Sequence, residues 1–431
     1  MTDPLQAIAN MATIASLLIP FTAVLAGVVP RVGPGRALAL AARSLVRGAK
    51  IVSRRDDATH TLRRMRARPL TCALRLAAAA ASVLAAADSS APPANAAGAG
   101  AGALYTNPVL ALDFPDPTVL RGADGRFYVY GTMGNGHHIQ VASSPDLVAW
   151  QYHGEALEPP AWMGSASWAP DVTFHGGLYF MYFDAMQQSS GVMCIAVATS
   201  ASPLGPFRDA RGAPLFCSPP APNNFAAIDP KSFDDAATGR TLLYFGSDGA
   251  PISAVELAAN RTALAPGAPP PFPPLRPLVT ADPAQPYEGT LVEGAWLHQA
   301  RGLYYLYYSG NNCCSSGAHY AVMVARSAAA EGPFVKIGNA TGSGSNVILS
   351  EGPGGHFAAP GHNSVITDDA GSDFMLYHAY RAGDLAGPRM LLMDRITYDA
   401  DGWPHVGEPS SSPQPAPVVA ALGGDAGEAA E

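Results

Sequence analysis

The stretch FPDPTVLRGADGRFYVYGT, residues 114–132, decides the fold, because the same order of features occurs five times along the chain. A polar residue comes first, followed by a short apolar run, a turn rich in Gly or Asp, and an alternating aromatic strand. The other copies are WAPDVTFHGGLYFMYFD (168–184), AIDPKSFDDAATGRTLLYFGS (227–247), LVEGAWLHQARGLYYLYYSG (291–310) and PGHNSVITDDAGSDFMLYHAY (360–380). Turn residues between two alternating strands predict a β-hairpin in each copy.

The spacing of these copies indicates a propeller. Their leading polar residues lie 55 to 69 residues apart, and further short strands follow each hairpin, which is the size of a four-stranded blade. We therefore predict an all-β fold, a five-bladed β-propeller over residues 104–407. The segment after Gly407 is rich in Ser, Pro and Ala, and we expect a disordered tail over residues 408–431.

The first hundred residues have a different composition from the rest. They carry 12 Lys and Arg against 4 Asp and Glu, with Phe21 as their one aromatic residue. An Ala-rich segment without aromatic residues cannot build a tightly packed core. We expect residues 1–103 to be a non-globular, disordered leader.

Two parts of this leader have the pattern of targeting segments. Residues 11–29 are apolar and long enough for a membrane anchor. Residues 65–97 run from a basic start through an apolar stretch to small residues, as in a secretory signal peptide. Three alternatives stay open: translation beginning at Met65, a true anchor through residues 11–29, and an organelle transit segment. The first two predict a secreted or membrane-anchored protein.

Charge and cysteine content limit the partners. The net charge of −8 argues against nucleic acid as the main partner, and we expect a monomer. No Cys and His spacing in the chain is typical of a zinc site. The adjacent Cys313 and Cys314 form either a vicinal disulfide or two buried thiols.

The leading residues of the repeats are candidates for chemistry. In a propeller the first strand of each blade lines the central channel, so equivalent positions converge there. The leading residues are Asp116, Asp171, Asp229, Glu293 and His362. A single Asp-Pro pair is ordinary turn chemistry, but an aligned set of carboxylates is costly unless it is used. Carboxylates beside aromatic rings such as Trp162, Trp168 and Trp296 fit glycoside hydrolysis.

These motifs also carry a family resemblance. The phrases NPVLALDFPDPTVLR, SWAPDV, AIDPKSF, VEGAW, PGHNSV and DRITYDADGWP follow one another over residues 104–407. In their order and spacing they resemble glycoside hydrolase family 43, the five-bladed arabinanases, arabinofuranosidases and xylosidases. The resemblance implies an enzyme that inverts the anomeric carbon of arabinose- or xylose-containing polysaccharides such as arabinan or arabinoxylan, and that needs no cofactor for its chemistry.

The resemblance also assigns roles. It implies that Asp116 is the general base, Glu293 the general acid and Asp229 the residue that raises the pKa of the acid. It places His362 where family members hold a calcium or other ion, and Arg389 where substrate or the modulating carboxylate is contacted. We expect Trp168, Asp171 and Trp296 on the substrate side, with Asp171 structural or channel-lining and not catalytic.

The substrate stays open at this point. The stretch SGNNCCSSGAHYAVMVARS favours the arabinanase-like branch, whereas FPDP, without a His before the Asp, is typical of xylosidase-like members. An invertase-like fructoside hydrolase is one alternative, although its NDPNG, RDP and EC phrases are absent from the sequence. A non-catalytic carbohydrate-binding propeller is another, and a scaffold propeller for protein partners a third. For single displacement, Asp116 and Glu293 should lie about 6.5–9.5 Å apart.

Overall fold

The computed structural model describes residues 102–209, 211–220, 224–246, 249–268, 271–272 and 277–420. The leader expected over residues 1–103, with its signal and anchor segments, lies almost wholly outside these residues. No helix in the described ranges is long and apolar enough to cross a membrane.

The predicted all-β class is confirmed, because the described chain forms five consecutive antiparallel sheets and only one short helix. Each sheet contains one of the repeats found in the sequence. The first comprises β2 (Thr118–Arg121), β3 (Phe127–Gly131), β4 (Gln140–Ser144) and β5 (Gln151–Glu155), and the second β6 (Met163–His175), β7 (Leu178–Gln187), β8 (Met193–Ser200) and β9 (Phe216–Cys217). The third comprises β10 (Lys231–Asp235), β11 (Arg240–Phe245) and β12 (Ser253–Leu257).

The remaining sheets continue the same pattern. The fourth comprises β13 (Val292–Ala300), β14 (Leu303–Asn312), β15 (His319–Ser327), β16 (Val335–Lys336) and β17 (Val347–Leu349), with the short helix α5 (Ile337–Thr341) between the last two. The fifth comprises β18 (Phe357–Thr367), β19 (Asp373–Arg381) and β20 (Met390–Arg395). A small two-stranded ribbon, β21 (Thr397–Tyr398) and β22 (Pro404–His405), follows it.

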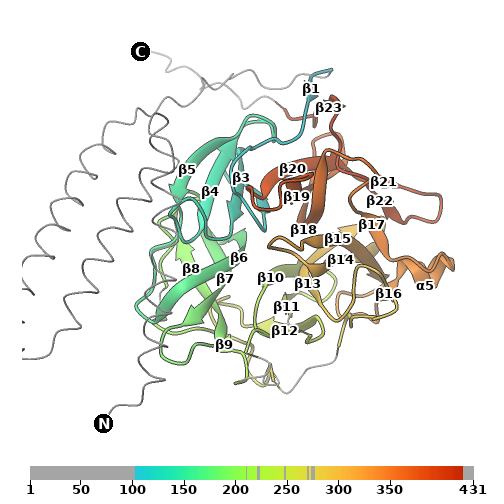
Figure 1. Ribbon diagram of the computed structural model, residues 1–431. Helices are drawn as coiled ribbons and strands as arrows, with labels where there is room; N and C mark the ends of the chain where they lie inside the picture. The colour runs from blue at the N-terminus through green and yellow to red at the C-terminus, as the bar shows by residue number, and fades with distance from the viewer. Residues whose placement is uncertain are drawn as a thin grey trace, which may run out of the picture. The chain divides into compact units, whose positions relative to one another are not determined.

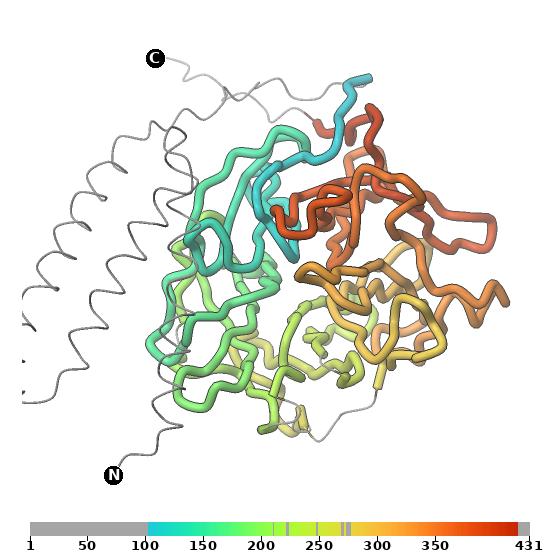
Figure 2. The backbone as a smooth tube through the Cα atoms, in the orientation of Figure 1, coloured from blue at the N-terminus to red at the C-terminus, as the bar shows by residue number. Residues whose placement is uncertain are grey.

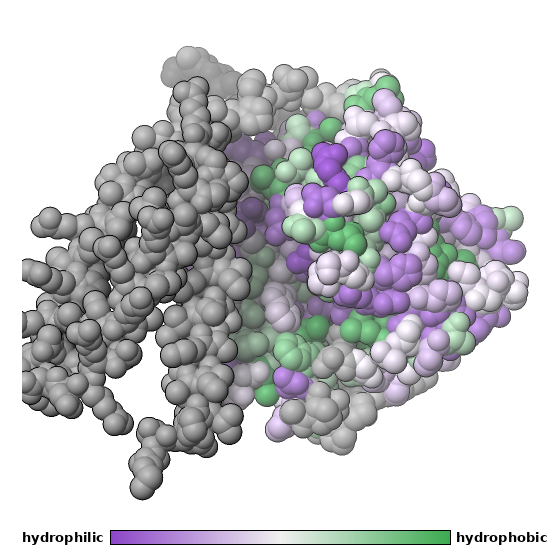
Figure 3. Space-filling model, in the orientation of Figure 1, coloured by the Kyte–Doolittle hydropathy of each residue, from purple (hydrophilic) through white to green (hydrophobic). Residues whose placement is uncertain are grey.

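The five sheets are arranged in a ring (Figures 1 and 2). Their first strands contact one another in the order β2, β6, β10, β13 and β18, and β18 contacts β2 again. Hydrophobic side chains fill the spaces between neighbouring sheets. On the face of the ring seen in Figure 3, polar side chains are interspersed with apolar ones.

The aromatic alternation in the sequence follows from this packing. In β3, Phe127 and Val129 point into the core shared with the fifth sheet, whereas Tyr128 and Tyr130 point into the core shared with the second. Successive strand residues face opposite sides, so a strand between two neighbouring sheets must be apolar on both. The strand β14 divides its residues in the same way between the third and fifth sheets.

The predicted disordered tail is wrong for residues 408–420. Strand β23 (Gln414–Pro415) pairs antiparallel with β1 (Leu104–Tyr105). Beyond it, the Val418 backbone N–H donates to Asp368 Oδ2 at 2.9 Å. A Ser- and Pro-rich segment indicates disorder because it cannot form a core of its own. Here backbone pairing with β1 orders this segment.

Ending the chain at Gly407 should therefore destabilise the ring. The truncation removes β23 and its backbone hydrogen bonds, each worth about 1 kcal/mol, so we expect a loss of about 3 kcal/mol in the free energy of unfolding. Urea unfolding followed by tryptophan fluorescence measures it. The matched control ends at Ala420 and should unfold like the full chain. Equal midpoints for both truncations would show that β23 contributes nothing.

Candidate active site

A pocket opens at the centre of the ring, along the first strands of the sheets. Its lining includes both charged and aromatic side chains contributed by several sheets, among them Asp116, Asp229, Lys231, Trp296, His362 and Asn363. Another hollow, lined by residues such as His298, Arg301 and Tyr398, lies between the fourth and fifth sheets and contains none of the leading residues. We take the first pocket as the candidate active site because the predicted groups meet there.

The backbone identifies the equivalent position in each sheet. Each first strand has a residue with positive φ either shortly before it or within it: Asp116 (55°), Ala169 (41°), Asp229 (56°), Gly294 (62°) and His362 (47°). The left-handed conformation is rare for residues other than Gly, Asn and Asp, so its recurrence marks a turn that each sheet needs. The predicted alignment of leading residues is therefore wrong at two places. Asp171 lies two residues after the equivalent Ala169, and Glu293 lies one residue before Gly294.

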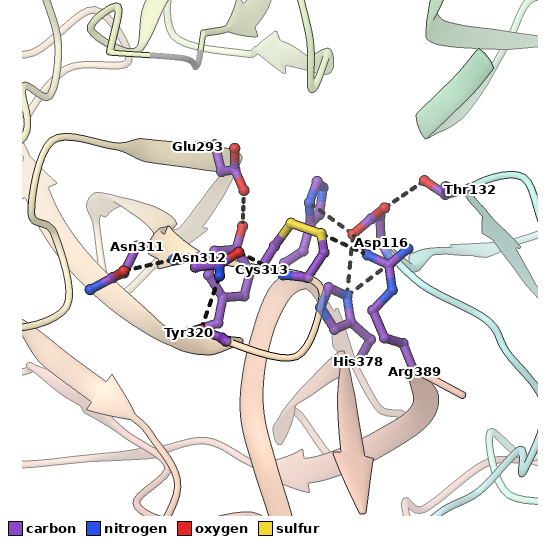
Figure 4. Close-up of a disulfide and its surroundings, with 12 residues drawn as sticks. Asp116, Thr132, Glu293, Asn311, Asn312, Cys313, Tyr320, His378 and Arg389 are labelled. Carbon is purple, nitrogen blue, oxygen red and sulfur yellow. Dashed lines mark hydrogen bonds and ion pairs between the residues drawn. A yellow bond between two sulfur atoms is a disulfide. The ribbon is translucent and has the colours of Figure 1, made fainter. Parts of the chain in front are cut away.

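Asp116 is surrounded by nitrogen groups (Figure 4). Its Oδ1 lies 3.3 Å from His362 Nδ1, 3.2 Å from His378 Nδ1 and 3.7 Å from Arg389 Nη1. The Thr132 hydroxyl donates to Oδ2 at 2.6 Å. Its side chain is only 12% exposed, so these groups and not bulk water set its protonation.

These neighbours keep the Asp116 carboxyl ionised. Burial alone would raise its pKa, but His362 and Arg389 outweigh burial and hold the pKa of Asp116 well below its usual range. Burial in turn lowers the pKa of His362 to about 4. Since His362 is then neutral near pH 7, Arg389 is the permanent positive charge beside Asp116.

Glu293 lies in a different environment on β13. The residue is 8% exposed, and its Oε1 accepts a hydrogen bond of 2.6 Å from the Tyr320 hydroxyl. The Tyr320 ring in turn packs closely on Gly361, where an added Cβ would lie 1.9 Å from a ring carbon. The absence of a side chain at Gly361 therefore lets Tyr320 approach Glu293.

Two further carboxyls lie behind Glu293. Asp229 Oδ2 accepts the Gly294 backbone N–H at 2.9 Å, and Asp184 Oδ1 accepts the Asp229 backbone N–H at 3.2 Å. Burial raises the pKa of Asp229 well above its usual range, and Glu293 and Asp184 raise it further. Burial likewise raises the pKa of Asp184, whose Oδ2 has no hydrogen-bond partner in the described part of the chain. This side of the pocket therefore favours protonated carboxyls.

Asp171 has a structural role. It is 1% exposed, and its oxygens accept hydrogen bonds from Lys231 Nζ at 2.7 Å and from the Ser232 hydroxyl at 2.6 Å. These contacts join the second sheet to the third, so the expected substrate contact at Asp171 is not supported. Lys231 Nζ lies 3.6 Å from the centre of the Trp296 ring, which lines the pocket. Trp168 stacks on Phe225 with ring centres 6.1 Å apart.

A family comparison decides the identity. The model of glycosyl hydrolases family 43 matches residues 105–404. The chain belongs to this family. The resemblance found in the sequence is thereby confirmed, and this family 43 protein is a glycosidase that hydrolyses O-glycosyl bonds.

Individual relatives cover the same part of the chain. An extracellular exo-alpha-(1->5)-L-arabinofuranosidase of Cellvibrio japonicus is 28% identical over 313 residues, 69% of this chain and 87% of that protein. An extracellular endo-alpha-(1->5)-L-arabinanase of Bacillus subtilis is 28% identical over 302 residues, 67% of this chain and 86% of that protein. The crystal structure of a thermostable family-43 glycoside hydrolase superposes with a TM-score of 0.60 at 30% identity, covering 73% of this chain and 99% of that one.

Sequence reasoning missed the polar residue that follows the aromatic run of the second strand in four of the sheets. Each accepts a hydrogen bond from the left-handed residue of the next sheet around the ring. The pairs are Thr132 with Ala169 N (2.8 Å), Asp184 with Asp229 N (3.2 Å), Ser309 with His362 N (2.9 Å) and His378 with Asp116 N (3.1 Å). The signal was present in the sequence, because each of these residues follows the aromatic alternation of its repeat.

The expected ion near His362 does not fit the residues found there. Calcium prefers about six to eight oxygen ligands. The groups around His362 are Asp116, a second imidazole and the Arg389 guanidinium, which repels a cation. No group of three or more His, Cys, Asp or Glu residues suited to a metal occurs among the described residues. We therefore derive no step through an ion.

Replacing Arg389 with Met should raise the pKa of Asp116, because the charge that stabilises its carboxylate is removed. A nearby opposite charge lowers a carboxyl pKa by about one to three units. If this carboxylate is required, activity is lost as the pH falls through its pKa, so the acidic limb of the kcat/KM profile of the Met variant should move upward by about one unit. Arg389→Lys, which keeps the charge, should move it less. An unmoved limb in the Met variant would exclude this electrostatic role.

Proposed function

We propose that the ring of five sheets is a five-bladed β-propeller that hydrolyses arabinose-containing polysaccharides by inversion at the anomeric carbon. Asp116 acts as the general base, Glu293 as the general acid and Asp229 as the carboxyl that favours the protonated acid. The proposal rests on the difference in charged groups between the two sides of the pocket. A cation and imidazoles surround Asp116, whereas buried carboxyls surround Glu293.

The proposed reaction is a single displacement. Ionised Asp116 accepts a proton from a water molecule, whose oxygen attacks the anomeric carbon. Glu293 donates its proton to the departing glycosidic oxygen. Two carboxyls with opposite protonation are what this chemistry needs. The lowered pKa of Asp116 and the raised pKa of Asp229 beside Glu293 support this assignment.

Arabinose is favoured over other sugars by the relatives. The two curated relatives described above act on alpha-(1->5)-linked arabinose according to their names. One is an exo-acting and the other an endo-acting enzyme at the same 28% identity, so we propose the linkage and leave the mode of attack to product analysis. The family match favours this function over an invertase-like fructosidase. The intact acid and base favour it over a non-catalytic binding propeller.

The proposal includes secretion. The disulfides Cys194–Cys217 and Cys313–Cys314 are typical of proteins that fold in an oxidising compartment. Both curated relatives named above are described as extracellular. Nothing in the described chain supports a membrane anchor. We propose a monomer that meets its polysaccharide outside the cell.

The test of function is product release from linear arabinan, branched arabinan, arabinoxylan, xylo-oligosaccharides and the nitrophenyl pentosides. Removing a general acid or base costs about 10²–10⁴-fold in rate, so Glu293→Gln and Asp116→Asn should each lose that much on arabinan. Asp171→Asn is the control: its thermal unfolding midpoint should fall below that of the wild type, whereas its hydrolysis rate should change less than that of the other two variants. Sugar binding without release from any substrate would instead favour the binding propeller.

The stereochemistry provides an independent test. Proton NMR of the first products, recorded before the released sugar mutarotates, should show the anomer opposite to that of the substrate. Inversion is expected because water has to fit between two carboxyls about 6.5–9.5 Å apart. Retention of configuration would contradict the base role of Asp116 and indicate a covalent intermediate.

A further inference from the structure

A vicinal disulfide lies in the active site. Cys313 and Cys314 are bonded to each other in the loop that joins β14 to β15, and both side chains are half-buried. In Figure 4 the sulfur atoms lie between the Glu293 side and the Asp116 side of the pocket. The mechanism proposed above gives this disulfide no role.

On the acid side the disulfide packs against the cluster that contains the hydrogen-bond partner of Glu293. Cys313 contacts a small buried cluster formed by Ala318, Tyr320, Ala359 and Tyr380. Tyr320 belongs to this cluster and donates its hydroxyl hydrogen bond to Glu293 Oε1 at 2.6 Å. Cys313 is thus part of the packing around the cluster that positions the Tyr320 ring.

On the base side the disulfide contacts the residue that holds Asp116. Arg389 Nη1 lies 3.6 Å from Cys314 Sγ and 3.7 Å from Asp116 Oδ1. The Arg389 side chain is 17% exposed, so its guanidinium is enclosed between the sulfur and the carboxylate. A series of contacts thus runs from Glu293 through Tyr320 and its cluster to the disulfide, and from there through Arg389 to Asp116.

The loop around the disulfide is fixed by its own amides. Asn312 Oδ1 accepts the Cys314 backbone N–H at 3.2 Å, and Asn312 Nδ2 donates to Gly317 O at 2.9 Å. Asn311 Nδ2 donates to Pro286 O at 3.1 Å. The covalent bond between adjacent residues removes further rotational freedom from the loop, and reduction would restore it.

We propose that the Cys313–Cys314 disulfide is a positioning element that holds Tyr320 and Arg389, and through them the general acid and the general base, in their working geometry. The inference rests on the function proposed above for Glu293 and Asp116. Its consequence is that the oxidised form of the loop is the active form.

The redox step is simple. Dithiothreitol supplies two electrons and two protons, leaves Cys313 and Cys314 as two thiols and is itself oxidised to a cyclic disulfide. The second disulfide, Cys194–Cys217, joins β8 to β9 and contacts none of the catalytic residues named here. It is the matched control, because reduction affects both bonds but only one lies in the pocket.

The experiment compares wild type, C313S/C314S and C194S/C217S on arabino-oligosaccharides before reduction, after reduction and after reoxidation, with alkylated peptides counted by mass spectrometry. A misplacement of about 1 Å can cost about 10²-fold, so we expect kcat of wild type to fall at least about 10-fold on reduction, with a smaller change in KM, and to recover on reoxidation. C194S/C217S should respond in the same way, whereas C313S/C314S should start low and not respond. Unchanged kcat in verified reduced wild type would overturn the proposal.

A second readout does not depend on hydrolysis. Phenylglyoxal modifies accessible guanidinium groups, so Arg389 should be modified several-fold faster in reduced wild type and in C313S/C314S than in the oxidised protein. C194S/C217S should retain the slow rate while oxidised. If oxidised wild type cleaves no sugar but Arg389 becomes reactive on reduction, the proposed function fails and the positioning role stands. An unchanged rate of Arg389 modification overturns the positioning role even in an active enzyme.

Discussion

Closure of the ring is the constraint on which the rest of the structure depends. Each first strand bends near the centre of the ring, where a left-handed residue precedes or interrupts it, from Asp116 in the first sheet to His362 in the fifth. The hydrogen bond from each of four of these residues to a polar side chain of the preceding sheet joins neighbouring sheets at the centre. The same contacts that close the ring therefore place ionisable groups around the pocket.

The division of charge across this pocket follows from which sheet supplies each neighbour. The fifth sheet and the loop before β20 provide His362, His378 and Arg389, all of which lie beside Asp116. The second and third sheets provide Asp184 and Asp229, which lie behind Glu293. A buried carboxyl without compensating charge takes up a proton, and one beside a guanidinium loses it. One protein interior thus supports two opposite protonation states a short distance apart.

Much of the fold and of the site could be predicted from the sequence, because each repeat contains both the alternating strand pattern and the turn residues. Asp116, Asp229, Glu293 and His362 were found in this way, and all four lie at the centre of the ring. Asp171 was placed wrongly because a carboxylate two residues further along the strand looks equivalent in the sequence, although the backbone is not. The pairing of β23 with β1 and the Cys194–Cys217 bond depend on contacts between distant segments, for which local composition gives no signal.

The pairing of β1 with β23 also brings the two ends of the folded chain together, since Leu104 is the register partner of Pro415. A short linker between them would turn the ring into a continuous circle of chain. New termini could then be opened in a loop between two other sheets without removing any strand, as in circular permutation. The ring of sheets therefore does not depend on which loop contains the chain termini.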